Sequence, residues 1–247
     1  ANEPEKMKEV EDELGEIDLS AGDGPKMVNA LIPYWDFANH ERGGEISTDF
    51  DPEKDISVCL ANRDFKAGEQ FTIFYGVRTN IDLLVHNGFV AAENEDESLI
   101  LKLGVSKNDP LFADKLNLLE KLTIPMSCFF ILGKDADKPV DGLLAAFLRV
   151  NSLKTKEEID LWSDGEKCRD LLDENLGDEY KELDKKAFQY LFTRCNLLLK
   201  SYPTTVEEDA ELLKKEDLPI NNRFCIVLRM QEKKTLQKTV EFCQKRI

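Results

Sequence analysis

Residues 70–80 read QFTIFYGVRTN, and the order of side chains in this stretch decides the fold class. Its first six residues alternate between polar and apolar in the manner of a half-buried strand, and Gly76 ends that strand. The spacing then becomes helical and predicts a short helix over Asn80–His86, with Thr79 or Asn80 as its cap and a stop near Asn87-Gly88. The stretch therefore marks the point where a β-containing region gives way to a helical one.

The chain on either side of this point carries matching signals. Ile56–Ala61 alternates as a second strand, and Asp64–Glu69 supplies turn residues between the two predicted strands. Helical periodicity dominates after Asn108, although Leu99–Leu103 has the composition of a strand. We therefore expect an α+β protein with three parts: an acidic leader or loop over residues 1–24, a mixed β region over 25–95 and an all-helical domain over 96–247.

In the helical part, several residue patterns mark the start or the apolar face of a predicted helix. Thr205 with Glu208 forms a capping-box pattern, and Pro219 precedes a long final helix. Further helices are predicted from Asp109-Pro110 onward, over Leu143–Val150, and along a face made of Ala187, Tyr190, Leu191, Cys195 and Leu198.

Composition excludes several classes of function. The chain has 49 acidic and 33 basic residues and a net charge of −16, which argues against binding to nucleic acid or to anionic lipid. Its apolar runs are shorter than the roughly 20 residues of a membrane helix. Two histidines and six scattered cysteines fit no zinc spacing, so we expect no metal, and free thiols in a reducing compartment.

Residue types alone give only weak evidence for a catalytic site. Trp35–His40 could be a loop with aromatic anchors and one hydrogen-bonded histidine, and Tyr75 could be an ordinary tyrosine at a strand end. His86 reads as structural. We find no nucleophile elbow and no phosphate-binding loop. These observations alone predict a soluble mixed domain followed by a helical domain.

Four segments taken together are more specific than any one of them. Asp36–His40, Phe65–Gln70, Phe74–Asn80 and His86–Phe89 occur in the order seen in the C-terminal half of SET methyltransferase domains. They resemble the branch related to the Rubisco large-subunit methyltransferase, and the resemblance extends over about residues 25–247. It implies the C-terminal part of a β-rich SET domain with a post-SET helix over 25–95, followed by the helical substrate-binding domain of that branch over 96–247.

The resemblance also implies site residues. S-adenosylmethionine is the implied cofactor, and Tyr75 is the implied catalytic residue that lines the methyl-transfer channel. Substrate contacts are implied for Trp35, for the carbonyl of Asp36 and for Arg78, which would orient the acceptor side chain. The cofactor contacts implied by the matching motifs are Asp36, Phe37, Ala38, Asn39, His40, Asn87, Gly88 and Phe89.

The acceptor is the least specific part of this expectation. At the position of Arg78, members of this branch have either arginine or lysine. With arginine there, the chain most resembles the group of enzymes that methylate a histidine of actin. Two alternatives stay open: a protein-lysine methyltransferase of the same branch, acting on a histone or another protein, and a catalytically incomplete fragment that binds a partner. SET domains also bind cofactor through an N-terminal G-x-G segment and an acidic residue, and the part of the domain that this chain resembles includes neither. We therefore expect an incomplete piece with weak or no activity of its own. We also expect a monomer located in the cytoplasm and also in the nucleus.

Overall fold

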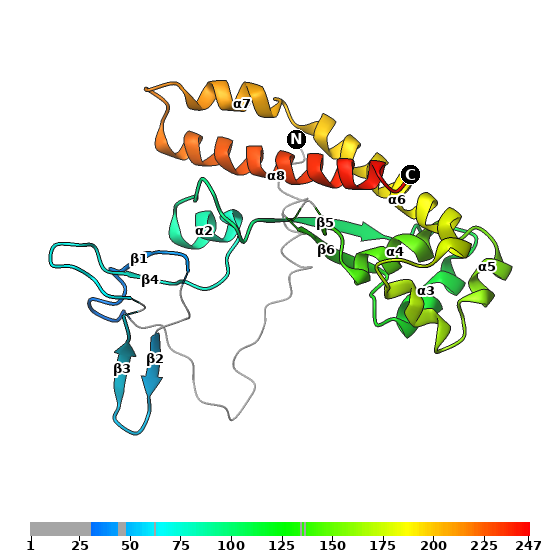
Figure 1. Ribbon diagram of the computed structural model, residues 1–247, viewed down its shortest axis with the longest axis horizontal. Helices are drawn as coiled ribbons and strands as arrows, with labels where there is room; N and C mark the ends of the chain where they lie inside the picture. The colour runs from blue at the N-terminus through cyan, green and yellow to red at the C-terminus, as the bar shows by residue number, and fades with distance from the viewer. Residues whose placement is uncertain (1–30, 44–47, 62, 134, 136) are drawn as a thin grey trace, which may run out of the picture. The chain divides into compact units, whose positions relative to one another are not determined.

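The computed structural model describes residues 31–43, 48–61, 63–133, 135 and 137–247 (Figure 1). The acidic leader predicted over residues 1–24 lies outside the described residues. The chain divides into two compact units, Ala1–Gly76 (unit 1) and Val77–Ile247 (unit 2), which are described separately below. The domain boundary predicted near residue 95 lies inside unit 2, because helix α2 (Asn80–Asn87) contacts the long C-terminal helix. The family-based domain limits stay a prediction.

Unit 1 contains two small sheets. Strands β2 (Thr48–Asp51) and β3 (Ile56–Cys59) form an antiparallel hairpin, in which Thr48 faces Cys59. Strands β1 (Asn39–His40) and β4 (Thr72–Ile73) pair in parallel, with Asn39 beside Thr72. The two strands expected from alternation thus exist in shorter form, but they belong to different sheets. The second sheet joins parts of the chain that are far apart in sequence.

Unit 2 is built mainly from helices around one apolar core. In Figure 1, the long helix α8 runs alongside α6 and α7, and both pairs of helices are in contact. The elements of this unit are α2 (Asn80–Asn87), β5 (Ser98–Gly104), α3 (Phe112–Lys121), β6 (Ser127–Gly133), α4 (Gly142–Ser152), α5 (Lys156–Leu161), η1 (Lys167–Leu172), η2 (Asp178–Tyr180), α6 (Lys181–Ser201), α7 (Val206–Leu213) and α8 (Ile220–Gln244).

The helix ends follow the local signals of the sequence. Thr79, and not Asn80, caps α2: its side chain accepts from the Asp82 backbone N–H, and the Asp82 carboxylate accepts from the Thr79 backbone N–H. The same reciprocal arrangement places Thr205 at the start of α7. At the other end of α2, Gly88 adopts φ 77°, a left-handed conformation that costs glycine little. These boundaries are local in origin, which explains why the sequence predicts them.

The expectation of an all-helical second part is wrong in one respect. Strands β5 and β6 form a seven-residue antiparallel ribbon in which Leu101 pairs with Phe130. The strand in β5 was expected, whereas β6 was missed. In β6 the inward side chains Phe130 and Leu132 are buried, but the outward Phe129 is apolar too, with 65% of its surface exposed. Because both faces are apolar, the sequence shows no period-two alternation for β6.

Several charged side chains are buried inside unit 2. Lys115 donates to the Asp109 carboxylate at 2.7 Å and to the Asn151 carbonyl at 2.9 Å. Arg149 donates to Asp184 at 2.6 Å and to the backbone carbonyls of Leu171 and Asp173. A buried charge is tolerated only when it is paired and hydrogen-bonded, so these contacts fix helix positions as well as neutralise charge.

A third buried cluster joins α7 to α8. Asp209 is fully buried and accepts hydrogen bonds from Arg229, Thr204 and Lys233, the last at 2.6 Å. Lys233 also donates to the carbonyls of Thr204 and Thr205, both at 2.8 Å. Burial opposes the ionisation of Asp209, but its charged and hydroxyl partners outweigh that cost and lower its pKa to about 2.

Candidate functional site

The parallel pair β1–β4 brings together three of the implied site residues of unit 1. The Tyr75 hydroxyl donates to the Ala38 carbonyl at 2.7 Å, and the Tyr75 backbone N–H donates to Nδ1 of His40 at 3.2 Å. The rings of His40 and Tyr75 lie 5.1 Å apart, and the ring of Phe74 lies 5.7 Å from that of His40, with 30° between the two planes. Tyr75 is therefore held at both its backbone and its hydroxyl by the segment from Ala38 to His40.

These contacts also define the chemical state of the two side chains. Because Nδ1 of His40 accepts a hydrogen bond, this imidazole carries its proton on Nε2 when neutral. Because the Tyr75 hydroxyl gives its proton to the Ala38 carbonyl, its oxygen acts as an acceptor toward any other group. The sequence predicted that these residues belong to one site, and the structure places them in direct contact.

The residues just before β1 form a turn. The Ile32 backbone N–H donates to the Asp36 carboxylate at 2.6 Å, and the Ala38 N–H donates to the Trp35 carbonyl at 2.9 Å. Ala38 is buried, whereas Phe37 has 84% of its surface exposed. Asn39 is exposed at the end of this turn, and its carboxamide can both donate and accept. The turn thus offers an amide and aromatic surface suited to a polar ligand with a planar ring.

In unit 2, the segment from Arg78 to Asn80 is fixed at every residue. The Asn94 side chain donates to the Arg78 carbonyl at 2.8 Å, and Thr79 caps α2. Asn80 is fully buried, and its carboxamide pairs with the peptide of Ala91, donating to the carbonyl and accepting from the N–H, both at 2.9 Å. Arg78, the residue implied to orient the acceptor, therefore lies on a rigid backbone.

Two further side chains complete this arrangement. The Asn80 backbone N–H donates to the Glu97 carboxylate at 3.2 Å. Burial raises the pKa of Glu97 above its ordinary value, although N–H donors oppose that shift. The Asn80 carboxamide also donates to Oε1 of Gln231, and Nε2 of Gln231 donates to the Ala92 carbonyl at 2.8 Å. Residue patterns did not single out Asn94, Glu97 or Gln231, because isolated polar residues normally face solvent.

The last implied cofactor residues lie at the end of α2. Asn87 and Gly88 are exposed, and Phe89 is half-buried. The Gly88 N–H donates to the Leu84 carbonyl, and the Phe89 N–H donates to the Leu83 carbonyl, which closes the helix. A side chain on Gly88 would meet no atom within 4 Å, so this glycine is required for its backbone conformation and not for space. The implied site residues of the chain thus fall in both units.

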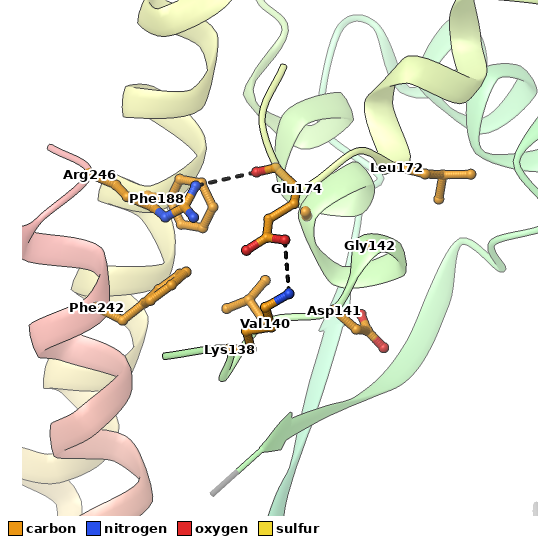
Figure 2. A pocket seen from close by; sticks show the side chains of 10 residues that line it. Lys138, Val140, Asp141, Gly142, Leu172, Glu174, Phe188, Phe242 and Arg246 are labelled. Atoms are coloured by element: carbon orange, nitrogen blue, oxygen red, sulfur yellow. Dashed lines mark hydrogen bonds and ion pairs between the residues drawn. The ribbon is translucent and has the colours of Figure 1, made fainter. Parts of the chain in front are cut away.

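A cavity of about 310 Å³ lies elsewhere in unit 2, at the start of α4 and between α6 and α8 (Figure 2). Its cations have partners: Lys138 pairs with Glu174 at 3.1 Å, and Arg246 stacks on the rings of Phe188 and Phe242. The cavity contains none of the implied site residues. Its paired charges and aromatic contacts join the C-terminal end of α8 to the rest of the helical unit.

Two features are absent from the described residues. They contain no cluster of three or more His, Cys, Asp or Glu side chains that could hold a metal ion. Among them, no helix combines the length and apolar character needed to cross a membrane.

Comparison with solved structures defines the fold. The chain superposes on the SET domain of LSMT bound to lysine and AdoHcy with a TM-score of 0.73 and 22% identity, over 87% of this chain and 50% of that one. Rubisco LSMT bound to sinefungin and monomethyllysine gives a TM-score of 0.71 and 25% identity, over 87% of this chain and 49% of that one. The chain thus has the fold of part of these SET methyltransferase structures.

The family model of the Rubisco LSMT substrate-binding domain matches residues 106–236, and the chain belongs to that family. Among curated relatives, the actin-histidine N-methyltransferase of Canis lupus familiaris is 40% identical over 222 residues. The enzyme of the same name from Homo sapiens is 39% identical over the same length. Both matches cover 89% of this chain and 37% of the relative, so the chain spans just over a third of the length of these proteins.

Proposed function

We propose that this chain carries the catalytic tyrosine and the helical substrate-binding domain of an S-adenosylmethionine-dependent methyltransferase whose acceptor is a histidine of actin. Two observations support the proposal. The first is the identity of about 40% to actin-histidine N-methyltransferases over most of the chain. The second, which carries the chemical argument, is the contact of Tyr75 with Ala38 and His40, because it organises the residues that the matching motifs assign to catalysis and cofactor binding.

The residues present fit the proposed cofactor. S-adenosylmethionine supplies an electrophilic methyl group on a sulfonium when it is bound. Asn39 would hold its amino-acid end through the exposed carboxamide, and Phe89 would contact its adenine. The Ala38 carbonyl accepts the hydrogen bond of the Tyr75 hydroxyl, so Ala38 would fix that tyrosine in addition to its proposed place beside the cofactor.

Tyr75 is proposed to act by position and not as a strong base. Its ring would line the passage between acceptor and methyl group and exclude water from it. Its hydroxyl proton is directed to the Ala38 carbonyl, so the hydroxyl oxygen can accept weak C–H···O contacts from the polarised methyl group. Methyl transfer requires in-line alignment, so the two hydrogen bonds that fix Tyr75 would serve the reaction directly.

A histidine acceptor makes modest demands on the site. Imidazole has a pKa of about 6.5 and is mostly neutral at physiological pH, whereas a lysine amine, at about 10.4, must first lose a proton. The site must instead select one ring nitrogen, which requires a group that binds the other. Arg78 and the Asp36 carbonyl are proposed for this orienting role.

The decisive experiment measures methyl transfer from labelled S-adenosylmethionine to an actin peptide with one histidine and to a matched peptide with lysine there. Both peptides are incubated with this chain and with a longer protein that contains it, and mass spectrometry locates the methyl group. We expect label on histidine only, with the longer protein more active. A Tyr75→Phe variant should lower turnover while peptide binding persists. Label on neither peptide with the longer protein would refute the proposal and favour a partner-binding role.

A lysine acceptor is the second candidate, and one observation favours it. Solved structures that share the fold were determined with lysine or monomethyllysine bound. Their identity to this chain is 22–25%, against about 40% for the histidine enzymes, so histidine ranks first. Label on the lysine peptide alone would reverse this order.

The proposal also covers the partners, the oligomeric state and the cellular location of the protein. A net charge of −16 disfavours contact with nucleic acid and with anionic membranes, and six cysteines without a disulfide framework suit a reducing compartment. We propose a monomer that acts in the cytoplasm and also in the nucleus. Sedimentation would test the oligomeric state, and cell fractionation would test the location.

A further inference from the structure

Helix α8 contributes a side chain to the segment that carries Arg78. Gln231 is separated from Asn80 by 151 positions in the sequence, and the Asn80 carboxamide donates a hydrogen bond to its Oε1 atom. Nε2 of Gln231 donates to the carbonyls of Ala91 and Ala92, at 3.2 and 2.8 Å. Helices α2 and α8 are in contact at this place and lie side by side in Figure 1.

The contacts around Asn80 leave its carboxamide little freedom. Its oxygen accepts from the Ala91 N–H, and its nitrogen donates to the Ala91 carbonyl and to Gln231. Asn80 is fully buried and Gln231 is 9% exposed, so the loss of either partner would leave buried polar atoms unsatisfied. The contact between Gln231 and Asn80 therefore has one favourable arrangement.

The same network extends from Asn80 to Arg78 along two routes. Along the chain, the capping box of Thr79 joins Arg78 to the first turn of α2. Across the loop that follows α2, Gln231 holds the carbonyl of Ala92, and Asn94 two residues later holds the Arg78 carbonyl. A displacement of Gln231 would thus be transmitted to Arg78 along both routes.

We propose that Gln231 is a positioning residue for Arg78, so that a residue of the substrate-binding domain sets how the acceptor side chain is oriented. The effect on the acceptor rests on the proposed function, whereas the mechanical link between Gln231 and Arg78 does not. Gln231 reaches no reacting atom in this scheme. It acts through Asn80 and Asn94, and its loss should change the choice between acceptors more than the affinity for cofactor.

The first experiment measures the link without any activity. Gln231→Met keeps the length of the side chain and removes its hydrogen bonds, and Gln237→Met makes the same change at an exposed site on the same helix. Amide hydrogen exchange is followed for residues 78–94 in this chain. We expect Gln231→Met to lower protection there about tenfold and Gln237→Met to change nothing. Equal protection in both variants would overturn the proposal.

The second experiment measures the consequence in an active protein that contains this chain. In Gln231→Met, label on the histidine peptide should fall and label on the lysine peptide should become detectable, so that the ratio of transfer to histidine over transfer to lysine drops several-fold or more, while affinity for S-adenosylmethionine holds. Asn94→Ala keeps the hydrogen bonds between Gln231 and Asn80 and removes the one to the Arg78 carbonyl. It should shift the ratio in the same direction, and it serves as the test if Gln231→Met fails to fold. A purely structural role would reduce transfer to both peptides equally, and that result would overturn the positioning role. An unmodified protein that labels neither peptide would instead refute the proposed function, and the exchange experiment would still decide the link.

Discussion

The two units of the chain are stabilised by different means. Unit 2 encloses a continuous apolar core from β5 to α8 together with buried, paired charges. Among the residues that the structure describes in unit 1, Ala38 and Ile73 are the apolar side chains that are buried. Unit 1 depends instead on backbone pairing and on hydrogen bonds such as that from Tyr75 to Ala38. Tyr75, the proposed catalytic residue, therefore lies in the unit with fewer buried apolar side chains among the described residues, and hydrogen bonds hold it in place.

The largest effect should come from breaking the buried charge cluster of unit 2. Asp209→Ala leaves Lys233 without its carboxylate partner in a buried site, which should lower the free energy of unfolding by about 3–5 kcal/mol. Urea denaturation followed by circular dichroism measures it. Glu211→Ala removes an exposed partner of Lys214 and serves as the control. Equal losses in the two variants would contradict the assignment of stability to the buried cluster.

Matched leucine truncations compare the two units directly. Leu119 is fully buried in the core of unit 2, and Leu119→Ala should cost about 2–5 kcal/mol of unfolding free energy. Leu60 in unit 1 is 64% exposed, and Leu60→Ala should change the same quantity by about 0.5 kcal/mol or less. The measurement is again chemical denaturation. The comparison between the units fails if Leu60→Ala costs as much as Leu119→Ala.

Acid should weaken unit 2 through Asp209. Its pKa is about 2 in the folded chain and 3.8 ordinarily, so ionised Asp209 stabilises the fold above about pH 4 and loses that contribution as the pH falls toward 2. The loss amounts to about 2 kcal/mol. Stability measured between pH 5 and 2 should fall less steeply in Asp209→Asn. Parallel curves for the two proteins would show that other carboxylates cause the acid sensitivity.

The smallest effect concerns the first helix of unit 2. Thr79→Ala removes the N-cap of α2 and should cost about 1 kcal/mol, mostly as fraying of this helix. Hydrogen exchange over Asn80–Asn87 measures the fraying, and Thr79→Ser should restore protection because serine is an equivalent cap. Uniform loss of protection throughout unit 2 would instead show that α2 unfolds together with the core.

The sequence predicted most of what is locally encoded. The cap at Thr205, the glycine end of α2 and the long helix after Pro219 follow from residues within one or two turns, and the structure confirms them. The pairing of β1 with β4 was not predicted, because two-residue strands leave no periodic signal and their register depends on distant contacts. Strand β6 was missed because both of its faces are apolar.

In the candidate site, too, features encoded by local motifs were predicted, whereas those that depend on distant contacts were not. Motif resemblance singled out Tyr75, His40 and Arg78, and the structure joins the first two through hydrogen bonds and ring contact. Resemblance gave no indication of Gln231, whose role depends on a contact with a residue 151 positions away. Similarly, the sequence analysis did not identify Asp209 and Lys233 as buried, since sequence alone does not show which charges have buried partners.

The parallel pairing of β1 with β4 has a consequence for the order of folding. Asn39 meets Thr72 only after the intervening chain has closed into a loop, and that closure costs entropy before any contact repays it. Helices of unit 2 form from neighbours in sequence and carry no such delay. The contact between His40 and Tyr75 should thus be among the last to form during refolding, later than the helices of unit 2.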